Sequence, residues 1–215
     1  TTGDYNTATG WNALASNTTA EANTAIGTVA LYSNTTGHDN TANGFQSLFT
    51  NTTGSFNTAN GIEALFSNTI GNYNSASGRQ ALRNNTIGLH NAASGSHALL
   101  NNTTGNFNTA FGNFALSSNT TGGQNTAFGA YSDVSSVSLS NATAIGYFAI
   151  VDASNKVRVG NTSVTSIGGQ VGWTTFSDGR YKQQIKEDVK GIEFIKQLRP
   201  VTYIVDLPSL DKYYN

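Results

Sequence analysis

Few residues of this chain have the type and spacing that chemistry requires. The sequence contains no cysteine, which excludes disulfide bonds and thiolate metal sites. Its histidines, His38, His90 and His97, lie at different phases of a repeat, and we expect His38 and His90 near one face, about three coils apart. This scattered arrangement favours solvated surface histidines over a metal site. An ion bound on the axis of a trimer, by three copies of one histidine, stays open as an alternative. We therefore expect no cofactor and no metal ion.

Asparagine and threonine allow two further interpretations. Asn-x-Thr/Ser sequons for N-glycosylation occur, for example at Asn17, Asn34, Asn51 and Asn161, but their periodicity favours a ladder of turn residues. A file of threonines at one repeat position suggests ice binding, which needs a flat, uninterrupted and paired array. This file is single and is interrupted by Ser75 and Ala92, so an ice- or surface-binding solenoid with a Thr/Asn face is the alternative function. The file consists of Thr7, Thr24, Thr41, Thr58, Thr109, Thr126 and Thr143.

The element that positions these side chains is a repeat of 17 residues. Its core reads Asn-Thr-Ala-x-Gly-x-x-Ala-Leu, and Asn-Thr-Thr-Gly usually precedes it. Unbroken periods at fixed spacing indicate stacked coils of backbone. Seventeen residues are too few for a helical pair, so the sequence predicts an all-β fold, a β-roll or β-solenoid. The glycine of the core recurs at Gly10, Gly27, Gly44, Gly61, Gly78, Gly95, Gly112, Gly129 and Gly146.

Each coil is expected to combine a turn with a short strand. Asn-Thr-Thr-Gly is turn chemistry, because Asn bonds the local backbone and Gly accepts positive φ. In Asn-Thr-Ala-x-Gly, directions alternate, so Ala25 is expected to point inward while Thr24 and Ile26 point outward. One leucine per coil, such as Leu48, adds the larger core group. In the eighth coil Asp133 replaces the leucine, which predicts a loop or a change of packing.

Such coils have a thin core and an aromatic exterior. We expect these outward groups to be covered by other copies of the chain, which predicts a parallel homotrimer. The outward positions hold Trp11, Phe45, Phe56, Ile62, Phe66, Tyr73, Phe107, Phe111, Phe114, Phe128, Tyr147 and Phe148.

The coils also resemble a known family. Asn23-Thr-Ala-Ile-Gly27 and Ala142-Thr-Ala-Ile-Gly146 are similar to the coils of trimeric autotransporter adhesin heads. That resemblance covers residues 1–150 and implies a β-roll assembled as a parallel homotrimer, although the period here is longer than in typical heads.

Composition changes near residue 150. Residues 1–150 hold two basic and five acidic residues, whereas residues 151–215 hold nine and seven. No basic stripe occurs, so we expect no nucleic-acid partner. No apolar run is long enough to predict a membrane span. The predicted organisation is a repeat head or shaft (1–150), a β-rich neck (151–176) and a small α+β segment (177–215). The chain starts in mid-repeat without methionine, which suggests a piece of a longer fibre.

The carboxyl-terminal segment carries a composite signature. Apolar residues at helical spacing predict a helix that Asp188 caps and Pro200 stops, followed by a strand over 201–205; the helical positions are Ile185, Val189, Ile192, Ile195 and Leu198. Ser177-Asp-Gly-Arg-Tyr-Lys182, the helix and Leu198-Arg-Pro200 together closely resemble the start of the endosialidase-type intramolecular chaperone domain of phage tail fibres and tailspikes.

This second resemblance implies one chemical step. In that family the domain trimerises the fibre and then cuts itself off before the serine, here at the Phe176–Ser177 bond. Ser177 would be the nucleophile and Lys182 the general base, if burial lowers the lysine pKa. The alternative is a turn serine and a solvated lysine. Since the family domain extends beyond residue 215, we expect slow or absent cleavage.

Together these features predict a structural and adhesive fibre. We expect an extracellular protein, either a virion tail fibre or a bacterial surface adhesin, whose partner is a cell-surface glycan or another envelope component. Its only enzymatic activity would be the cut in its own chain.

Overall fold

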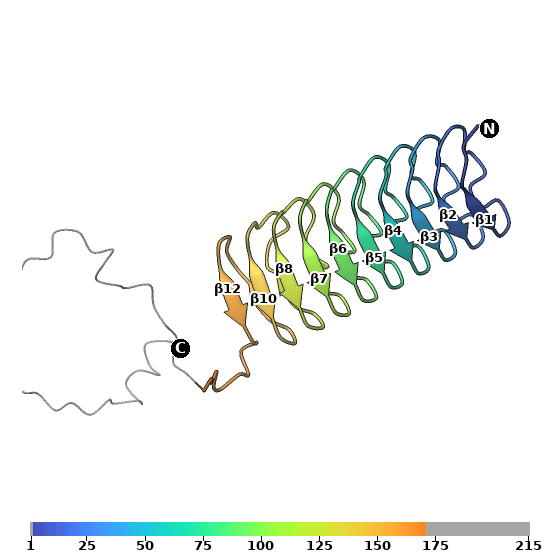
Figure 1. The fold of residues 1–215 in the computed structure, drawn as a ribbon. Coiled ribbons are helices and arrows are strands. Elements are labelled where there is room, and N and C mark those ends of the chain that lie inside the picture. Colours follow the sequence, from blue (N-terminus) through green and yellow to red (C-terminus); the bar gives the residue numbers. More distant parts are fainter. Residues whose placement is uncertain (1, 171–215) are drawn as a thin grey trace, which may run out of the picture. The chain divides into compact units, whose positions relative to one another are not determined.

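The computed structural model describes residues 2–170, which form a stack of coils built from short strands and turns without a helix. The strands that share one wall of the stack are β1 (Thr7–Thr9), β2 (Thr24–Ile26), β3 (Thr41–Asn43), β4 (Thr58–Asn60), β5 (Ser75–Ser77), β6 (Ala92–Ser94), β7 (Thr109–Phe111), β8 (Thr126–Phe128), β10 (Thr143–Ile145) and β12 (Val157–Val159). They form a ten-stranded parallel sheet in chain order and lie side by side along the stack (Figure 1). The predicted all-β solenoid of 17-residue coils is therefore confirmed.

Register follows the repeat. Ala42 of β3 pairs with Ala59 of β4, and the same phase pairs in every neighbouring couple from β1 to β10. In β3 the burial pattern is exposed, buried, exposed, so Ala42 points inward while Thr41 and Asn43 point outward. The predicted alternation is confirmed, because successive side chains of an extended strand face opposite sides.

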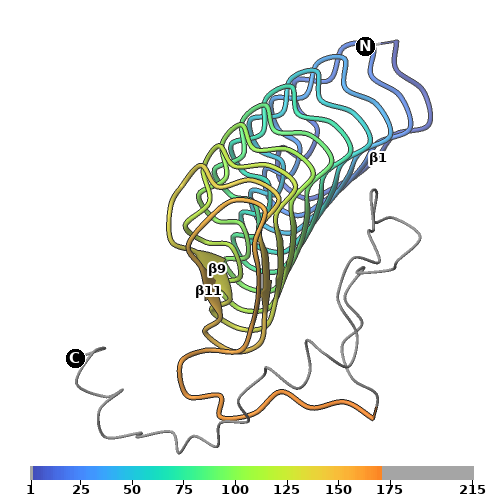
Figure 2. The same ribbon diagram turned by 90° about the vertical axis from the view of Figure 1, so that its left-hand side faces the viewer.

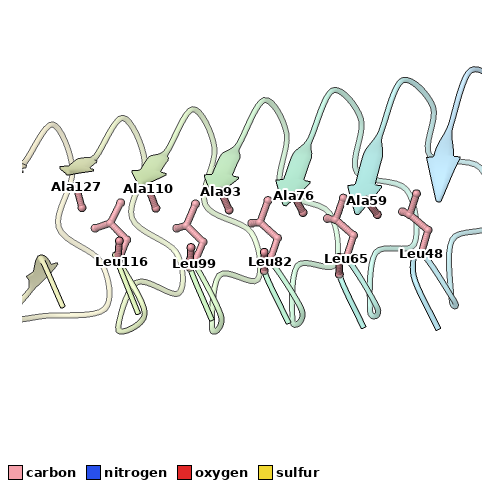
Figure 3. Packing of buried hydrophobic residues seen from close by; sticks show 14 of the residues in the cluster. Leu48, Ala59, Leu65, Ala76, Leu82, Ala93, Leu99, Ala110, Leu116 and Ala127 are labelled. Carbon is pink, nitrogen blue, oxygen red and sulfur yellow. The ribbon is translucent and has the colours of Figure 1, made fainter. Parts of the chain in front are cut away.

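Alanine and leucine form two facing columns inside the stack. Leucines of one wall reach toward the alanines of the strands (Figure 3). Leu65 and Leu82 are fully buried, as are Ala59 and Ala76. Burial of one leucine contributes about 1.5–3 kcal/mol. With a small alanine opposite it, each coil keeps a narrow core, as the sequence predicted.

The glycine that follows each strand is required by the neighbouring coil. Gly61 has φ of 136°, and its N–H donates to the carbonyl of Asn43 at 2.8 Å. A Cβ added to Gly61 would lie 2.6 Å from the carbonyl oxygen of Gly78 in the next coil. Both the conformation and the space exclude a side chain at this phase.

In each of the first seven coils, three further residues adopt the left-handed conformation although they are not glycine. In one coil these are Phe56, Glu63 and Leu65, with φ of 59°, 55° and 51°. Their N–H groups donate to carbonyls of adjacent coils, Phe56 to His38, Glu63 to Phe45 and Leu65 to Ala81, at 2.9–3.1 Å. A left-handed non-glycine residue costs on the order of 1–2 kcal/mol. The left-handed conformation orients each of these N–H groups along the stack axis. The hydrogen bonds that it allows between coils explain why these residues adopt it.

Two ladders of asparagine form the polar part of the interior. In the first, Asn68 donates from Nδ2 to the carbonyl of Gly71 at 3.0 Å and to Oδ1 of Asn51 at 2.8 Å. In the second, Oδ1 of Asn57 accepts the backbone N–H of Asn74 at 3.0 Å. These asparagines have at most 1% of their surface exposed. The expected turn chemistry is thus present, and it also joins each coil to the next.

The eighth coil changes its packing rather than forming a loop. Asp133 and Val134 form the strand β9 (Asp133–Val134), which pairs with β11 (Ile150–Val151). These strands lie on another side of the coil from the ten-stranded sheet (Figure 2). The leucine phase becomes extended here, and Val134 and Val151 supply the buried apolar groups.

The stack ends within the region predicted as a neck. Val157 of β12 pairs with Thr143, only 14 residues earlier, so the last coil is shorter. Arg158 takes the inward phase of Ala144 and donates to the carbonyls of Gly160 and Ile150 at 3.3 and 3.2 Å. The compact unit that contains the coils ends at Ile167. The predicted helix and strand of residues 177–215 lie outside the described residues.

Candidate interaction surface

The predicted catalytic pair lies outside the described residues. This holds for Ser177, for Lys182 and for the Phe176–Ser177 bond. Their chemistry therefore stays a prediction from the sequence, and the described surface is that of the coils.

An exposed column of stacked rings runs along the middle coils. Tyr73 stacks on Phe56, His90 on Tyr73 and Phe107 on His90, with centroids 4.8–4.9 Å apart and planes within 3°. His38 meets Phe56 edge-on at 4.9 Å. The rings coincide in direction because the four residues share one repeat phase with left-handed backbone. We call Phe56, Tyr73, His90 and Phe107 the central column.

A second column lies earlier along the stack. Phe49 stacks between Tyr32 and Phe66, with centroids 5.3 and 5.2 Å apart. The guanidinium of Arg83 ends this column over Phe66, 5.1 Å from the ring centroid, and its Nε bonds Glu63 at 2.6 Å. The bond from Arg83 is the main cause that lowers the pKa of the Glu63 carboxyl. The column is thereby closed by a half-buried ion pair.

A third column approaches the carboxyl-terminal coils. His97 stacks on Phe114 at 4.5 Å, and Phe114 stacks on Tyr131 at 5.5 Å. Burial, helped by the charge of Arg79, lowers the pKa of His97. Beyond Tyr131 the parallel order is lost, because Phe148 is tilted by 32° to it.

Stacking decides which part of each ring is available. Phe56, Tyr73 and Phe107 keep 43%, 51% and 57% of their surface exposed, although at least one face of each ring lies against a neighbouring ring. What remains is an apolar ridge that consists mainly of ring edges. Such a ridge suits contact with another apolar protein surface better than stacking of a sugar, which needs a ring face.

The predicted outward positions are mostly exposed. Ten of the twelve large apolar groups are exposed, and Phe66 and Phe114 are half-buried within their columns. The sequence thus identified the outward residues but not their stacking. The signal was present, since the members of the central column follow one another at the repeat period. His38 and His90 are exposed, as the interpretation of surface histidines expects, and His97 is half-buried; the sequence did not show that each also packs against a ring.

The asparagines of the sequons differ in how deeply the structure buries them. Asn34 and Asn51 are fully buried and donate to Gly37 and Gly54, which fits the predicted turn ladder. Asn161 is half-buried and donates to the carbonyl of Tyr147 at 3.1 Å. The buried sequons are therefore structural asparagines in the folded coil.

The threonine file is exposed but not paired. Thr41 and Thr58 are exposed at the first position of β3 and β4, and the second outward position of these strands holds Asn43 and Asn60. Farther along it holds Phe128. The face therefore offers one interrupted file of hydroxyls rather than the paired array that ice binding requires.

Asp133 is a buried carboxyl at the end of the leucine column. Only 8% of its surface is exposed, and it accepts bonds from Ser117 Oγ and from the N–H groups of Ser118 and Val134. Burial raises its pKa despite these bonds. All of these donors belong to the coil wall around it, so we assign Asp133 a structural role at the end of the leucine column.

Within residues 2–170 no three His, Cys, Asp or Glu side chains gather closely enough to hold a metal ion. The same residues contain no helix with the length and apolarity needed to cross a bilayer.

Neither a protein-family model, nor a curated protein, nor a solved structure matches the chain.

Proposed function

We propose that the chain is a structural and adhesive segment of a homotrimeric extracellular fibre, a tail fibre or a bacterial surface adhesin, that binds a cell-surface component. The observation that supports it is the contrast between a core of alanine, leucine and asparagine and an exterior of aligned aromatic rings. Exposed apolar ridges of this kind mark contact surfaces in soluble proteins.

The central column is the part of this surface that we assign to contact between chains. Its rings follow one another at the coil spacing, so a second stack in parallel register presents matching groups along its length. The column carries no carboxylate or ammonium group, so no fixed charge has to be desolvated when it is covered.

The test is the molar mass of the chain in solution, measured by light scattering. We expect a mass three times that of one chain. A triple variant, Phe56→Ser, Tyr73→Ser and Phe107→Ser, should lower that mass while the circular dichroism of the coils persists.

The control keeps the number of substitutions but changes another exposed position of the repeat. Thr41→Ser, Thr58→Ser and Thr126→Ser replace residues of the threonine file and should leave the mass unchanged. A monomeric wild-type chain would refute the proposal, and an unchanged mass of the aromatic variant would refute the role of the central column.

The second part of the proposal concerns maturation and rests on the resemblance in sequence alone. We assign cleavage of the Phe176–Ser177 bond to Ser177 as nucleophile and Lys182 as base. Mass spectrometry of the incubated chain tests it: a product that ends at Phe176 and disappears in Ser177→Ala supports the pair, and its rapid appearance would show that the expectation of slow or absent cleavage is wrong. The same product in Ser177→Ala would contradict it.

A further inference from the structure

A depression of about 550 Å³ lies where the third column ends. Its apolar side is formed by Tyr147, Phe148 and Ile150, and its polar side by Arg158, Asn161 and the hydroxyl residues that follow, Thr162 and Ser163. All these residues belong to the last two coils and the turn after β12. Apolar and aromatic walls with a few convergent polar groups are typical of small-ligand sites.

The depression offers an aromatic ring that no parallel ring covers. Tyr147 lies at 53° to Phe148 and at 85° to Tyr131, so no parallel neighbour covers its ring, and it is 63% exposed. Phe148 is 50% exposed. One face of a sugar ring is rich in C–H groups, and a ring face of this kind is the surface against which it packs.

Hydrogen bonds fix the two sides of the depression to each other. Arg158 donates from Nη1 to the carbonyl of Ile150 at 3.2 Å, and Asn161 donates from Nδ2 to the carbonyl of Tyr147 at 3.1 Å. Oδ1 of Asn161 accepts the N–H of Ser163 at 2.9 Å. The site is therefore held in shape before any ligand arrives, which lowers the entropy cost of binding.

The positive charge of the depression has no direct counter-charge. The three ion pairs found within residues 2–170 do not include Arg158, whose bonds go to the carbonyls of Gly160 and Ile150. Asp152 is the nearby carboxylate, and its pKa is lowered chiefly by its bond to Lys156 at 2.7 Å. A guanidinium has more N–H donors than these two carbonyls occupy, and its planar fork matches a carboxylate.

We propose that this depression binds an acidic sugar residue of a surface glycan, with the sugar ring against Tyr147 and Phe148 and the carboxylate at Arg158. The hydroxyls of Thr162 and Ser163 would then contact the hydroxyls of the sugar. This inference rests on the proposed adhesive function and names the ligand class and the site.

The test measures binding of trigalacturonate and 3′-sialyllactose to the whole chain by saturation-transfer NMR and calorimetry, with lactose as the neutral comparison. We expect at least one acidic probe to bind and lactose to bind at least about tenfold more weakly. Affinity for the acidic probe should fall as salt is added, because the attraction is between charges near the surface.

Three variants at two residues test the two sides of the depression. Tyr147→Ala should weaken acidic-probe binding at least about tenfold without touching the hydrogen bonds of Arg158. Arg158→Gln should remove the preference over lactose, and Arg158→Lys should keep part of it. Tyr5→Ala is the matched control, because Tyr5 is 87% exposed and belongs neither to the depression nor to the three columns, and it should leave binding unchanged. Circular dichroism confirms that each variant is folded.

Failure of the inference is distinguishable from failure of the proposed function. The inference is overturned if folded wild-type chain binds neither acidic probe, if lactose binds equally well, or if Tyr147→Ala binds like wild type. The mass of the same samples reports separately on the trimer. A trimer without acidic-probe binding refutes only the site, and a monomer that binds refutes only the fibre.

Discussion

The buried asparagine ladder makes a sharp prediction about stability at Asn57. Its Oδ1 accepts bonds from the backbone N–H and the Nδ2 of Asn74, at 3.0 and 3.2 Å. Its Nδ2 donates to the carbonyl of Gly71 at 2.8 Å and to Oδ1 of Asn40 at 3.1 Å. Asn57→Ala removes all four bonds inside a fully buried site.

The magnitude follows from the one group left without a partner. The backbone N–H of Asn74 loses the bond that Asn57 provides, whereas the carbonyl of Gly71 keeps its bond from Nδ2 of Asn68. An unsatisfied buried polar group costs about 1–3 kcal/mol, so the variant should lose about 1–3 kcal/mol of unfolding free energy. Asn60→Ala is the control in the same coil, because Asn60 is exposed on β4, and it should change stability by no more than about 0.5 kcal/mol.

Urea unfolding followed by circular dichroism measures both variants. Because a solenoid can open coil by coil, hydrogen exchange of the Asn74 amide gives the local reading, and protection there should fall in Asn57→Ala. If the midpoint of Asn57→Ala equals that of Asn60→Ala, or if the Asn74 amide stays protected, the ladder does not hold the coils together as described.

Four further outcomes are expected. Gly61→Ala should prevent folding of the neighbouring coils, seen as lost circular dichroism, because its Cβ would lie 2.6 Å from the carbonyl of Gly78; normal unfolding of this variant would contradict the close approach. Leu82→Ala should cost about 2–5 kcal/mol in urea unfolding, since Leu82 is fully buried; a loss below about 1 kcal/mol would show that the core collapses around it. Burial raises the pKa of Asp133, so its contribution is present at low pH and is lost as pH rises through the native pKa. The stability of wild type relative to Asp133→Asn should therefore fall as pH rises above the ordinary aspartate range, and a flat difference would refute the assignment. The pKa of His97 is lowered, so its contribution is present at neutral pH and is lost as pH falls through the native pKa. The unfolding free energy of His97→Phe should therefore not show this decrease at acidic pH. NMR titration of His97 in the wild-type chain checks the lowered pKa independently.

Much of the coil could be predicted from the period and from residue size. The inward alanine of each strand, the buried leucine and the glycine after the strand all follow from recurrence at one phase, as Ala59, Leu65 and Gly61 illustrate. The departure at Asp133 was also visible, as a break in the leucine phase. A change of packing was one of its two interpretations, and the pairing of β9 with β11 shows that it applies.

The candidate surface could be predicted only in part. Recurrence of aromatic residues identified the outward positions, but stacking depends on the direction in which each Cβ leaves the backbone. That direction is set at Tyr73 and Phe107 by left-handed φ of 58°, which is unusual for aromatic residues. The depression beside Arg158 needed the fold as well, because residues 147–150 and 158–163 belong to successive coils.

By itself the sequence determined the coil length, the inward residues and the all-β class, because a fixed period forces equivalent residues into equivalent environments. Only the tertiary structure decided the backbone within each coil. Leu65 has no local preference for a φ of 51°. It adopts this left-handed conformation because its N–H then donates a hydrogen bond to the carbonyl of Ala81 in the next coil. The buried asparagines have the same origin, since their partners lie a coil away. Interactions between coils, absent from any isolated repeat, therefore set both the conformation and the exposed face of each ring.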